Sequence, residues 1–485
     1  MEQSVTLDSN SRIAQIASAA CPTISERLAD FAASLELGHV PHAVVLRAKH
    51  LLLDAIGCAF AAREEEFAER IATSVAKLAG PGPRGVLGMG YRLPLRDAAM
   101  VNGMLMHGLD YDDTHAAGVL HLTVSTFPTA LATSAHVDAS GAELLTAYIV
   151  GVETGARIAS VVKGGFHEVG FHPTGVVGAF ASSLVAGRLM ELSRARLAGA
   201  QGIALSLASG NLQFIEDGSW TKRLHPGWAA ACGITAASLA ADDIPAPQEA
   251  YEGRFGLYRS HLPPAELAAC DFAIATTGFG SVWEISNVAI KPFPACHFVH
   301  GCADAAIALH QAGVDPARIR SIRALVPGGV VKSVCEPVAA KRRPKNDYDA
   351  RFSIPYAVAS GLARGRLGLA ELLPEALVEP CIERLMDKVD YVVDKASTFP
   401  KHYSGEVIVT LDDGRTLNHR VAVNRGNPDR PLGNAEIEAK YFENCAITLS
   451  SDAARYIRSL VLDLESVTSA AQFEAALASS GEIQV

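Results

Sequence analysis

The chain has 485 residues, of which 49% are hydrophobic and 19% are charged, and its formal net charge is −10. This length predicts two to four domains with a large core, and the composition excludes a disordered protein. The negative charge excludes a basic nucleic-acid-binding face. Because an average soluble domain has ~25% charged residues, we expect part of the surface to be buried in a subunit interface.

The sequence carries no sign of export or of a membrane span. The N-terminal segment MEQSVTLDSNSR has neither a basic region nor an apolar core of the kind found in signal peptides. Residues 116–137 and 169–187 are uncharged, but both contain histidine and proline, which predicts buried helices. Nine cysteines occur, none spaced as Cys-x-x-Cys, so we expect reduced thiols in a cytoplasmic protein, without a disulfide framework or a zinc site.

Residues 24–241 have helical periodicity almost throughout. Pro41 is expected to open a long helix over HAVVLRAKHLLLDAIGCAFAA, and Asp97 to cap a helix over AAMVNGMLMHG that ends at Gly108. Ser140 begins a Ser-x-x-Glu capping box. Further helices are expected at 175–192, 194–208 and 228–241. Their abundant small residues predict close helix–helix contacts.

The pattern changes near residue 275, where strands begin to alternate with helices. We expect strands at 283–290, 318–326, 405–411 and 417–423, the last two forming a hairpin, and helices at 296–312, 347–365, 434–444 and 453–464. The predicted fold is mainly α: a large all-helical domain formed by both chain ends (1–274 and 432–485), with an inserted smaller α+β domain (275–431).

One cluster of polar residues follows the helix that ends at Gly108. Asp110, Asp112, Asp113 and His115 lie within six residues, and His121 follows. Carboxylates this close cannot all be buried and unpaired, so at least one needs a raised pKa, a basic partner or a metal. Alternatively, Asp112 and Asp113 cap the next helix in a surface turn. A metal held by the aspartates and His115 lacks a second ligand group at a recognisable spacing, so we expect none.

Two further groups of polar residues are candidates for the functional site. Lys222, Arg223 and His225 place three cationic or proton-carrying groups within four residues, which in an acidic protein indicates either an anion site or a solvated basic turn. Lys291 leaves a predicted strand where the insertion begins. Two prolines then stiffen the chain up to His297.

Two more histidines lie near predicted helix starts. His300 follows His297 at helical spacing, so the two rings are expected to face one way, although either ring can equally be structural. His172 precedes a proline at the start of a helix, where backbone N–H groups bind carboxylates. No dinucleotide-binding, P-loop, HExxH or GxSxG motif is present, so no cofactor is expected.

Five strings carry a resemblance to a known family: VNGMLMHGLDYDDTH, FHPTGVVGAF, EDGSWTKRLHPGWAAACGITAASLA, KPFPACHFVHGCADA and DYDARFSIPYAVASGLARG. In this order they resemble the MmgE/PrpD family of 2-methylcitrate dehydratases, cis-aconitate decarboxylases and iminodisuccinate epimerases. The resemblance implies a homodimer, an active site between a helical body and an α+β lid, and no metal or organic cofactor. It implies active-site residues at Asp110, Thr114, His121, His172, Lys222 and Lys291.

The resemblance also implies a chemistry, namely proton transfer at a carbon beside a carboxylate. We expect Lys222 and Lys291 to stabilise the developing charge and Asp110 and His121 to act as general base and acid, with His121 protonating the leaving hydroxyl in a dehydration. The expected substrate-binding residues are Thr114, His172, Arg223, His225, Cys296 and His297.

The expected function is a cofactor-independent, 2-methylcitrate dehydratase-like lyase acting on a small anionic di- or tricarboxylate. An epimerase, a decarboxylase and a non-catalytic paralogue are the alternatives. The lid string of the animal cis-aconitate decarboxylases has a histidine where Cys296 stands, a tyrosine of theirs is replaced near residues 330–331, and one residue is inserted between Thr114 and His121. These differences weigh against decarboxylase activity.

Overall fold

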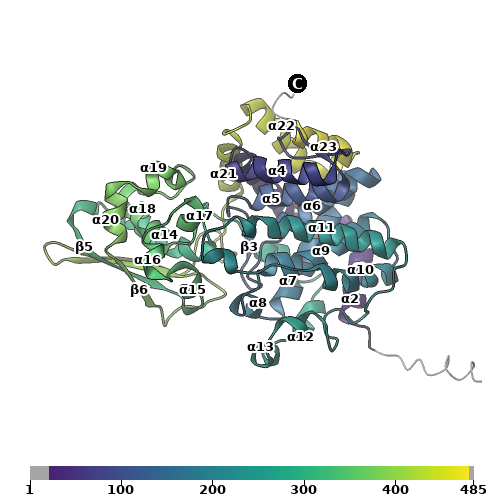
Figure 1. Cartoon of the computed structure of the whole chain (residues 1–485), viewed down its shortest axis with the longest axis horizontal. Helices are drawn as coiled ribbons and strands as arrows, with labels where there is room; N and C mark the ends of the chain where they lie inside the picture. Colours follow the sequence, from purple (N-terminus) through teal and green to yellow (C-terminus); the bar gives the residue numbers. More distant parts are fainter. Residues whose placement is uncertain (1–20, 480–485) are drawn as a thin grey trace, which may run out of the picture.

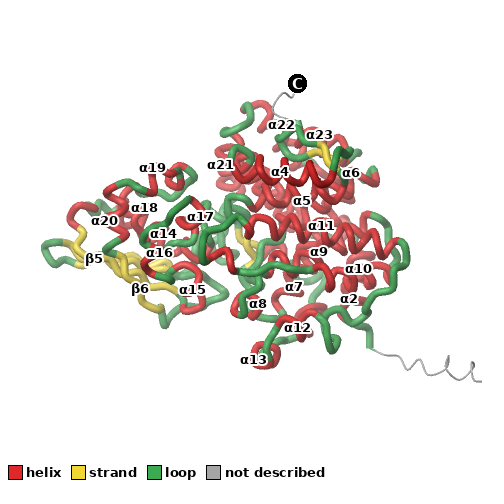
Figure 2. The backbone as a smooth tube through the Cα atoms, viewed as in Figure 1, coloured by secondary structure: helices red, strands yellow, loops and turns green. Residues whose placement is uncertain are grey.

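The computed structural model describes residues 21–479, so the N-terminal segment MEQSVTLDSNSR, expected to lack a signal, lies outside the described residues. The fold is mainly helical with a small mixed sheet, as predicted. Figure 1 shows a larger helical unit and a smaller unit beside it, and Figure 2 shows most strands gathered in the smaller one. Each unit has its own hydrophobic core. We call them the helical body and the lid.

The helical body contains segments from both ends of the described chain. Its helices are α2 (Ile24–Ser34), α3 (His42–Ala62), α4 (Glu66–Ala79), α5 (Leu95–His107), α6 (Thr123–Val137), α7 (Gly141–Ser160), α8 (Gly165–Glu168), α9 (Pro173–Leu189), α10 (Arg194–Leu207), α11 (Thr221–Ala241), α12 (Leu257–His261), α13 (Pro264–Ala268), α21 (Asn434–Cys445), α22 (Ser451–Leu462) and α23 (Ala470–Ala478). The C-terminal helices α21 and α22 pack on α3, and α23 packs on α6. The domain boundaries at 274 and 431 stay a prediction.

Small residues let α11 pack closely against α9 and α5. A Cβ atom on Gly233 would lie 2.3 Å from the Cβ of Ser182 in α9, and one on Gly227 would lie 2.1 Å from the carbonyl oxygen of Met100 in α5. Neither position accepts a larger side chain without moving backbone. These contacts fix α11, whose first turn carries Lys222.

The lid is a four-stranded sheet covered by helices. The strand order is β6-β5-β7-β8, and β5 (Ile319–Val326) pairs in parallel with β6 (Val389–Val393) and antiparallel with β7 (Gly405–Leu411). The hairpin partner of β7 is β8 (Thr416–Val421). The lid helices are α14 (His300–Gln311), α15 (Val331–Val334), α16 (Val338–Lys341), α17 (Asp347–Arg351), α18 (Ile354–Arg364), α19 (Pro374–Leu377) and α20 (Pro380–Met386).

Three local features agree with the sequence-based predictions: one helix, one capping box and one hairpin. The helix after Pro41 spans His42–Ala62, Ser140 forms the capping box with Glu143, and the predicted hairpin is present. The body also has the short pair β1 (Arg84–Gly85) and β2 (Arg92–Leu93). These outcomes confirm predictions that rest on local signals.

Two local predictions are wrong. Asp97 does not cap its helix, because α5 begins earlier, after Pro94, and Asp97 lies in its first turn, where a negative charge is favourable. Residues 283–290 do not form a long strand. Glu284–Asn287 is a 3₁₀ turn, and only β4 (Val288–Ala289) is extended. The amide of Ile285 donates to Glu153 Oε1 (2.8 Å), so a side chain replaces the expected strand partner.

Two predicted lid helices are also interrupted. The helix expected at 296–312 is a 3₁₀ turn, His297–Val299, followed by α14. The helix expected at 347–365 breaks between α17 and α18, where Ser353 caps the second helix.

The described residues, 21–479, also show the character of the helices and the state of the cysteines. Within this range, no helix has the length and apolar character needed to cross a bilayer. All nine cysteines lie in this range, and each is a free thiol.

Candidate active site

A cavity lies at the junction of the helical body and the lid. It encloses about 40 Å³, room for a few water molecules, since ~10–15 Å³ of such volume holds one. Both units contribute side chains to it. The lining residues are Asp110, Thr114, Val119, His121, His167, His172, Leu212, Phe214, Ile215, Lys222, Lys291, Cys296, His297, Phe298, Ser333, Phe352 and Tyr403.

A pair of two-residue strands brings the segment of Asp110 next to the segment of Lys291. The strand β3 (Thr114–His115), labelled at the junction in Figure 1, pairs antiparallel with β4, with Thr114 opposite Ala289. Lys291 follows β4 by two residues and therefore reaches Asp110. Asp110 itself has a left-handed backbone with a φ of 50°, which turns the chain sharply after α5.

Asp110 binds two lysines from distant segments. Its Oδ1 accepts hydrogen bonds from Lys222 Nζ (2.9 Å) and Lys291 Nζ (2.7 Å), and its carbonyl oxygen accepts a second one from Lys291 (2.8 Å). All three side chains are buried. Burial alone would raise the pKa of Asp110, but the two ammonium groups hold it well below the usual range. An ionised carboxylate bound in this way is a poor proton acceptor.

His121 is held in one tautomer. Its Nδ1 lies 2.5 Å from the carbonyl oxygen of Asp113 and 3.3 Å from Asp112 Oδ2. Because both neighbours are acceptors, we assign the ring proton to Nδ1, which leaves Nε2 with a free lone pair. Burial lowers the pKa of His121 well below its usual value, so the ring is neutral near pH 7 and its Nε2 carries no proton.

Asp112 joins two histidines behind the cavity. Its carboxylate lies 2.9 Å from Nδ1 of His107, at the end of α5, and also faces His121. Burial opposes ionisation of Asp112, but the two imidazoles lower its pKa below the usual range. Asp112 therefore does not cap the next helix.

Asp113 differs from its neighbour Asp112. Its Oδ1 accepts a hydrogen bond from the backbone amide of Leu122 (3.2 Å), directly before α6, so the capping alternative holds in part for Asp113. The site is not the surface turn of that alternative, because Asp112 and Asp113 are both buried. Burial and the adjacent Asp112 raise the pKa of Asp113 to about 7.

His172 precedes α9 as expected, and its ring faces the cavity. Its Nδ1 lies 2.8 Å from Nδ1 of His225, which lies behind it and is not among the lining residues. Burial, followed by the nearby His225, lowers the pKa of His172 well below its usual value. Burial likewise lowers the pKa of His225 to about 4.

The structure brings most of the predicted site residues to one cavity, but His225 lies behind its lining and Arg223 points elsewhere. The guanidinium of Arg223 donates to the carbonyl oxygen of Gly108 (2.7 Å) and stacks on the rings of Phe67 and Tyr348. It therefore supports the turn that leads to Asp110 and does not line the cavity. Residues one apart on a helix point in different directions, so Lys222 and Arg223 cannot share a target.

The lid contributes Cys296 and His297, two of the expected substrate-binding residues, to the lining of the cavity. His297 and His300 face each other with ring centroids 4.6 Å apart, and Asn424 Nδ2 lies 2.7 Å from His297 Nε2. Burial lowers the pKa of His297 to about 3 and raises that of Cys296 to about 11. Both are therefore uncharged near neutral pH.

Sequence reasoning missed two neighbours of the site. His107 was included only as the end of a helix, although it stands five residues before Asp112, within the first motif. Tyr403, from the segment before β7, lines the cavity and packs edge-on against His297 at 5.0 Å. No signal near Tyr403 marks it, because only the lid's folding brings residue 403 beside the motif at 291–300.

Two groups of side chains have donor atoms close enough to share a metal ion. His107, His121 and His172 form one, and His107, Asp110, Asp112 and His121 form the other, with donor atoms within 4.8 Å of one another. In the second group each carboxylate already has strong partners, the lysines for Asp110 and the imidazoles for Asp112. A metal would have to replace these contacts, so a metal-independent site stays our expectation.

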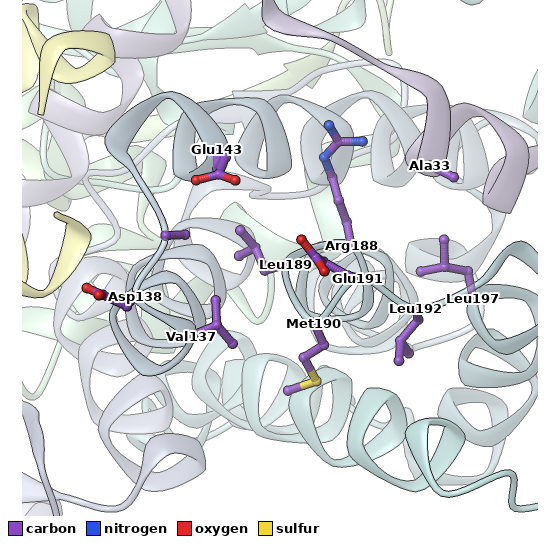
Figure 3. A pocket seen from close by; sticks show the side chains of 11 residues that line it. Ala33, Val137, Asp138, Glu143, Arg188, Leu189, Met190, Glu191, Leu192 and Leu197 are labelled. Atoms are coloured by element: carbon purple, nitrogen blue, oxygen red, sulfur yellow. The ribbon is translucent and has the colours of Figure 1, made fainter. Parts of the chain in front are cut away.

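A larger cavity of about 610 Å³ lies within the helical body (Figure 3). Its two most prominent charged groups already have backbone partners. Glu143 completes the capping box with Ser140, and Arg188 donates to the carbonyl oxygens of Ala32 and Leu35. The other charged lining residues are two carboxylates, Asp138 and Glu191, so Arg188 is the one cation among the lining residues and it is already bound to the backbone.

Comparison with known proteins agrees with the motifs. Residues 26–269 match the MmgE/PrpD N-terminal domain, and residues 293–466 match the MmgE/PrpD C-terminal domain. The chain is 28% identical to the cis-aconitate decarboxylase of Homo sapiens, over 91% of this chain and 92% of that protein. It is 27% identical to the cis-aconitate decarboxylase-like protein oryM of Aspergillus oryzae, over 95% and 98%.

A third relative, the cis-aconitate decarboxylase of Aspergillus terreus, is 26% identical over 92% of this chain and 94% of its own length. The two domain matches together cover most of the described residues. The chain therefore belongs to the MmgE/PrpD family.

Proposed function

We propose that the protein is a cofactor-independent lyase that dehydrates a small hydroxy-tricarboxylate at the cavity between the helical body and the lid. The observation that carries this proposal is the position of a neutral His121 in the same cavity as Lys222 and Lys291. A base and two cations are what proton removal beside a carboxylate requires.

The lysines supply the electrostatic stabilisation. Two ammonium groups share one carboxylate, Asp110, which leaves one net positive charge in the buried cluster. This positive charge stabilises a substrate carboxylate placed against Lys222 and Lys291. It also stabilises the carbanion that forms beside that carboxylate. Asp110 then acts as an anchor for the lysines, in place of the acid or base role expected from the sequence.

His121 transfers the proton from the substrate carbon to the leaving hydroxyl. Its Nε2 takes the proton from the carbon next to a carboxylate, and the resulting imidazolium is stabilised by Asp112 and by the carbonyl oxygen of Asp113. When the carbon–oxygen bond breaks, the departing hydroxyl takes that proton from Nε2 and leaves as water. One proton moves from carbon to oxygen, and the ring returns to its starting form.

Decarboxylation of cis-aconitate is the second candidate, favoured because relatives of this chain are cis-aconitate decarboxylases. In that reaction carbon dioxide leaves first, and the carbanion left behind needs a proton. His121 would have to be protonated before the reaction, whereas burial lowers its pKa well below its usual value. The state of His121 therefore favours proton removal as the first step, and dehydration over decarboxylation.

The small cavity volume has a consequence for substrate entry. About 40 Å³ holds a few waters but no tricarboxylate. Entry requires the lid side chains, among them Cys296, Phe298 and Tyr403, to withdraw from the body. Their return on binding would exclude water and strengthen the lysine interactions.

Proton NMR of the purified protein in D₂O tests the proposal, with 2-methylcitrate, cis-aconitate and iminodisuccinate as separate substrates. We expect loss of the hydroxyl-bearing substrate and appearance of a vinyl or allylic signal. Formation of itaconate from cis-aconitate would favour the decarboxylase instead. Exchange of the iminodisuccinate α-proton alone would favour an epimerase, and no change with any of the three would contradict the proposed lyase.

A further inference from the structure

Two histidines beside the cavity are joined nitrogen to nitrogen. His172 Nδ1 and His225 Nδ1 lie 2.8 Å apart, within hydrogen-bond distance. A neutral imidazole carries one proton, so a hydrogen bond between these atoms requires one ring to hold its proton on Nδ1 and the other to have a bare Nδ1. The two rings are therefore in opposite tautomers, and the pair decides what His172 presents to the cavity.

The neighbouring histidines indicate which ring is the donor. His107 gives its Nδ1 proton to Asp112, so its Nε2 is bare, and this buried atom has no hydrogen-bond partner among the described residues. His121 gives its Nδ1 proton to the Asp113 carbonyl, so its Nε2 is also bare. One nitrogen of each of the rings of His107, His121 and His172 lies within 4.8 Å of the others. Nδ1 of His172 faces His225, so Nε2 is the nitrogen of His172 that is left for the cavity, and a proton there complements the bare Nε2 of His121 in the same cavity.

We propose that His225 is a positioning residue whose Nδ1–H donates to His172 Nδ1 and so keeps the proton of His172 on Nε2, facing the cavity. His172 then acts as a neutral hydrogen-bond donor opposite the acceptor His121. The catalytic effect of this hydrogen bond rests on the proposed function, in which the Nε2–H of His172 stabilises the negative charge that develops on the substrate. No proton leaves His172, so the pair returns unchanged after each turnover.

The local structure suits this role. His225 lies three residues after Lys222 on α11, so one helix face carries both the lysine and the ring behind His172. His172 is fixed from the other side, because it stands directly before α9 and its amide donates to the carbonyl oxygen of Gly210 (3.1 Å). The His225 ring also packs edge-on against Phe214, with centroids 6.1 Å apart.

Two substitutions separate hydrogen bonding from packing. In His225→Asn the amide nitrogen occupies the position of Nδ1 and still donates to His172. In His225→Phe the ring volume and the contact with Phe214 are kept, but the donor is lost. We expect kcat of the Asn variant within about fivefold of wild type, and a loss of about 10²-fold for Phe with KM within threefold, since one preorganised donor contributes about 10²–10³-fold.

The control is His261→Asn. His261 is also partly buried, but its Nδ1 contacts the carbonyl oxygen of its own helix at Leu257, and it does not line the cavity. It should keep wild-type kinetics. Equal activity of the Phe and Asn variants of His225, or greater activity of Phe, would overturn the positioning role. Inactivity of both would overturn it as well, because it would require an imidazole at 225.

A measurement without substrate keeps this inference separate from the proposed function. Nitrogen-15 NMR of the full-length enzyme distinguishes protonated from bare ring nitrogens, and His172→Asn and His225→Asn samples assign the two rings. We expect protonated Nε2 on His172 and protonated Nδ1 on His225. Protonated Nδ1 on His172 would overturn the inference. The expected tautomers without turnover of any carboxylate would instead contradict the proposed function alone.

Discussion

Lys291 binds Asp110 twice, through the carboxylate at 2.7 Å and through the backbone carbonyl at 2.8 Å. The second contact depends on the left-handed backbone of Asp110, with a φ of 50°. Asp110 thus fixes the ammonium group of Lys291, and Lys291 in turn stabilises an unusual backbone conformation. Lys222 makes only the carboxylate contact and otherwise packs over the ring of Phe352.

This asymmetry predicts different costs for the two lysines. Lys222→Met and Lys291→Met should each lower kcat/KM by at least about 10²-fold, or about 2.7 kcal/mol, because each removes a charge that stabilises the carbanion. Lys291→Met should also lower the melting temperature more than Lys222→Met, because it leaves the Asp110 carbonyl without its donor. Breaking a buried pair costs about 3–5 kcal/mol of unfolding free energy.

Lys332→Met is the matched control for the lysine variants. Lys332 is exposed and lies 3.7 Å from Glu168 at the surface, so its loss should change neither kcat/KM nor the melting temperature measurably. Steady-state kinetics and thermal unfolding of all three variants give the comparison. Activity of both cavity variants within threefold of wild type would contradict the anion-binding role of the lysines.

Asp112 should matter for rate more than for substrate binding. Asp112→Asn keeps a hydrogen-bonding group between His107 and His121 but removes the charge that stabilises the imidazolium of His121. We expect kcat to fall by about 10²-fold with KM within threefold, since the charge acts only after proton transfer. The control is His115→Gln, because His115 contacts Glu284 outside the cavity. An equal loss in both variants, or a loss confined to KM, would contradict this role.

Activity should survive EDTA treatment and dialysis, because the lysines and His121 supply the proposed chemistry. Addition of Zn²⁺ is the informative second arm. If zinc occupies His107, His121 and His172, it takes the lone pair of the proposed base and inhibits the enzyme. Loss of activity on EDTA that one divalent ion restores would instead establish a metal-dependent enzyme.

The sequence predicted those parts of the site that lie within one motif. Lys222 and Lys291 are recognisable from their neighbours, and the helix of residues 42–62 follows from its periodicity. The contact between Asp110 and Lys291 is not predictable in this way, because a strand pair of two residues, β3 with β4, joins segments about 180 residues apart. Two-residue strands leave no periodic signal.

Arg223 was predicted to bind substrate, but its side chain does not line the cavity, and the reason differs from that for Asp110 and Lys291. Arg223 stands beside Lys222 in a cationic cluster, but adjacency in the sequence does not show in which direction each side chain points. Once residues 221–241 form one helix, successive residues point about 100° apart, so Arg223 turns to Gly108 and Asp347 while Lys222 faces the cavity. The predicted start at residue 228 placed both residues outside the helix and hid this geometry.

The raised pKa of Asp113 predicts that the free energy of unfolding depends on pH. Its folded-state pKa is about 7, raised by burial and by Asp112, against an unfolded value of 3.8. As pH rises above about 4 the unfolded chain releases this proton first, so the contribution of Asp113 to stability is complete below that pH. The contribution is then lost as pH rises to about 7. By linkage the loss is roughly 4 kcal/mol at pH 8.

Asp113→Asn should remove this loss, since an amide cannot ionise and its oxygen can still accept the hydrogen bond from Leu122. We expect the unfolding free energy of the variant, relative to wild type, to rise steadily from pH 4 to pH 8, as measured by urea denaturation at five pH values. The difference at pH 4 serves as the internal control, because both side chains are neutral there in the folded state. A difference that stays constant with pH would mean that Asp113 is ionised in the folded protein throughout this range, and that capping of α6 is its main contribution.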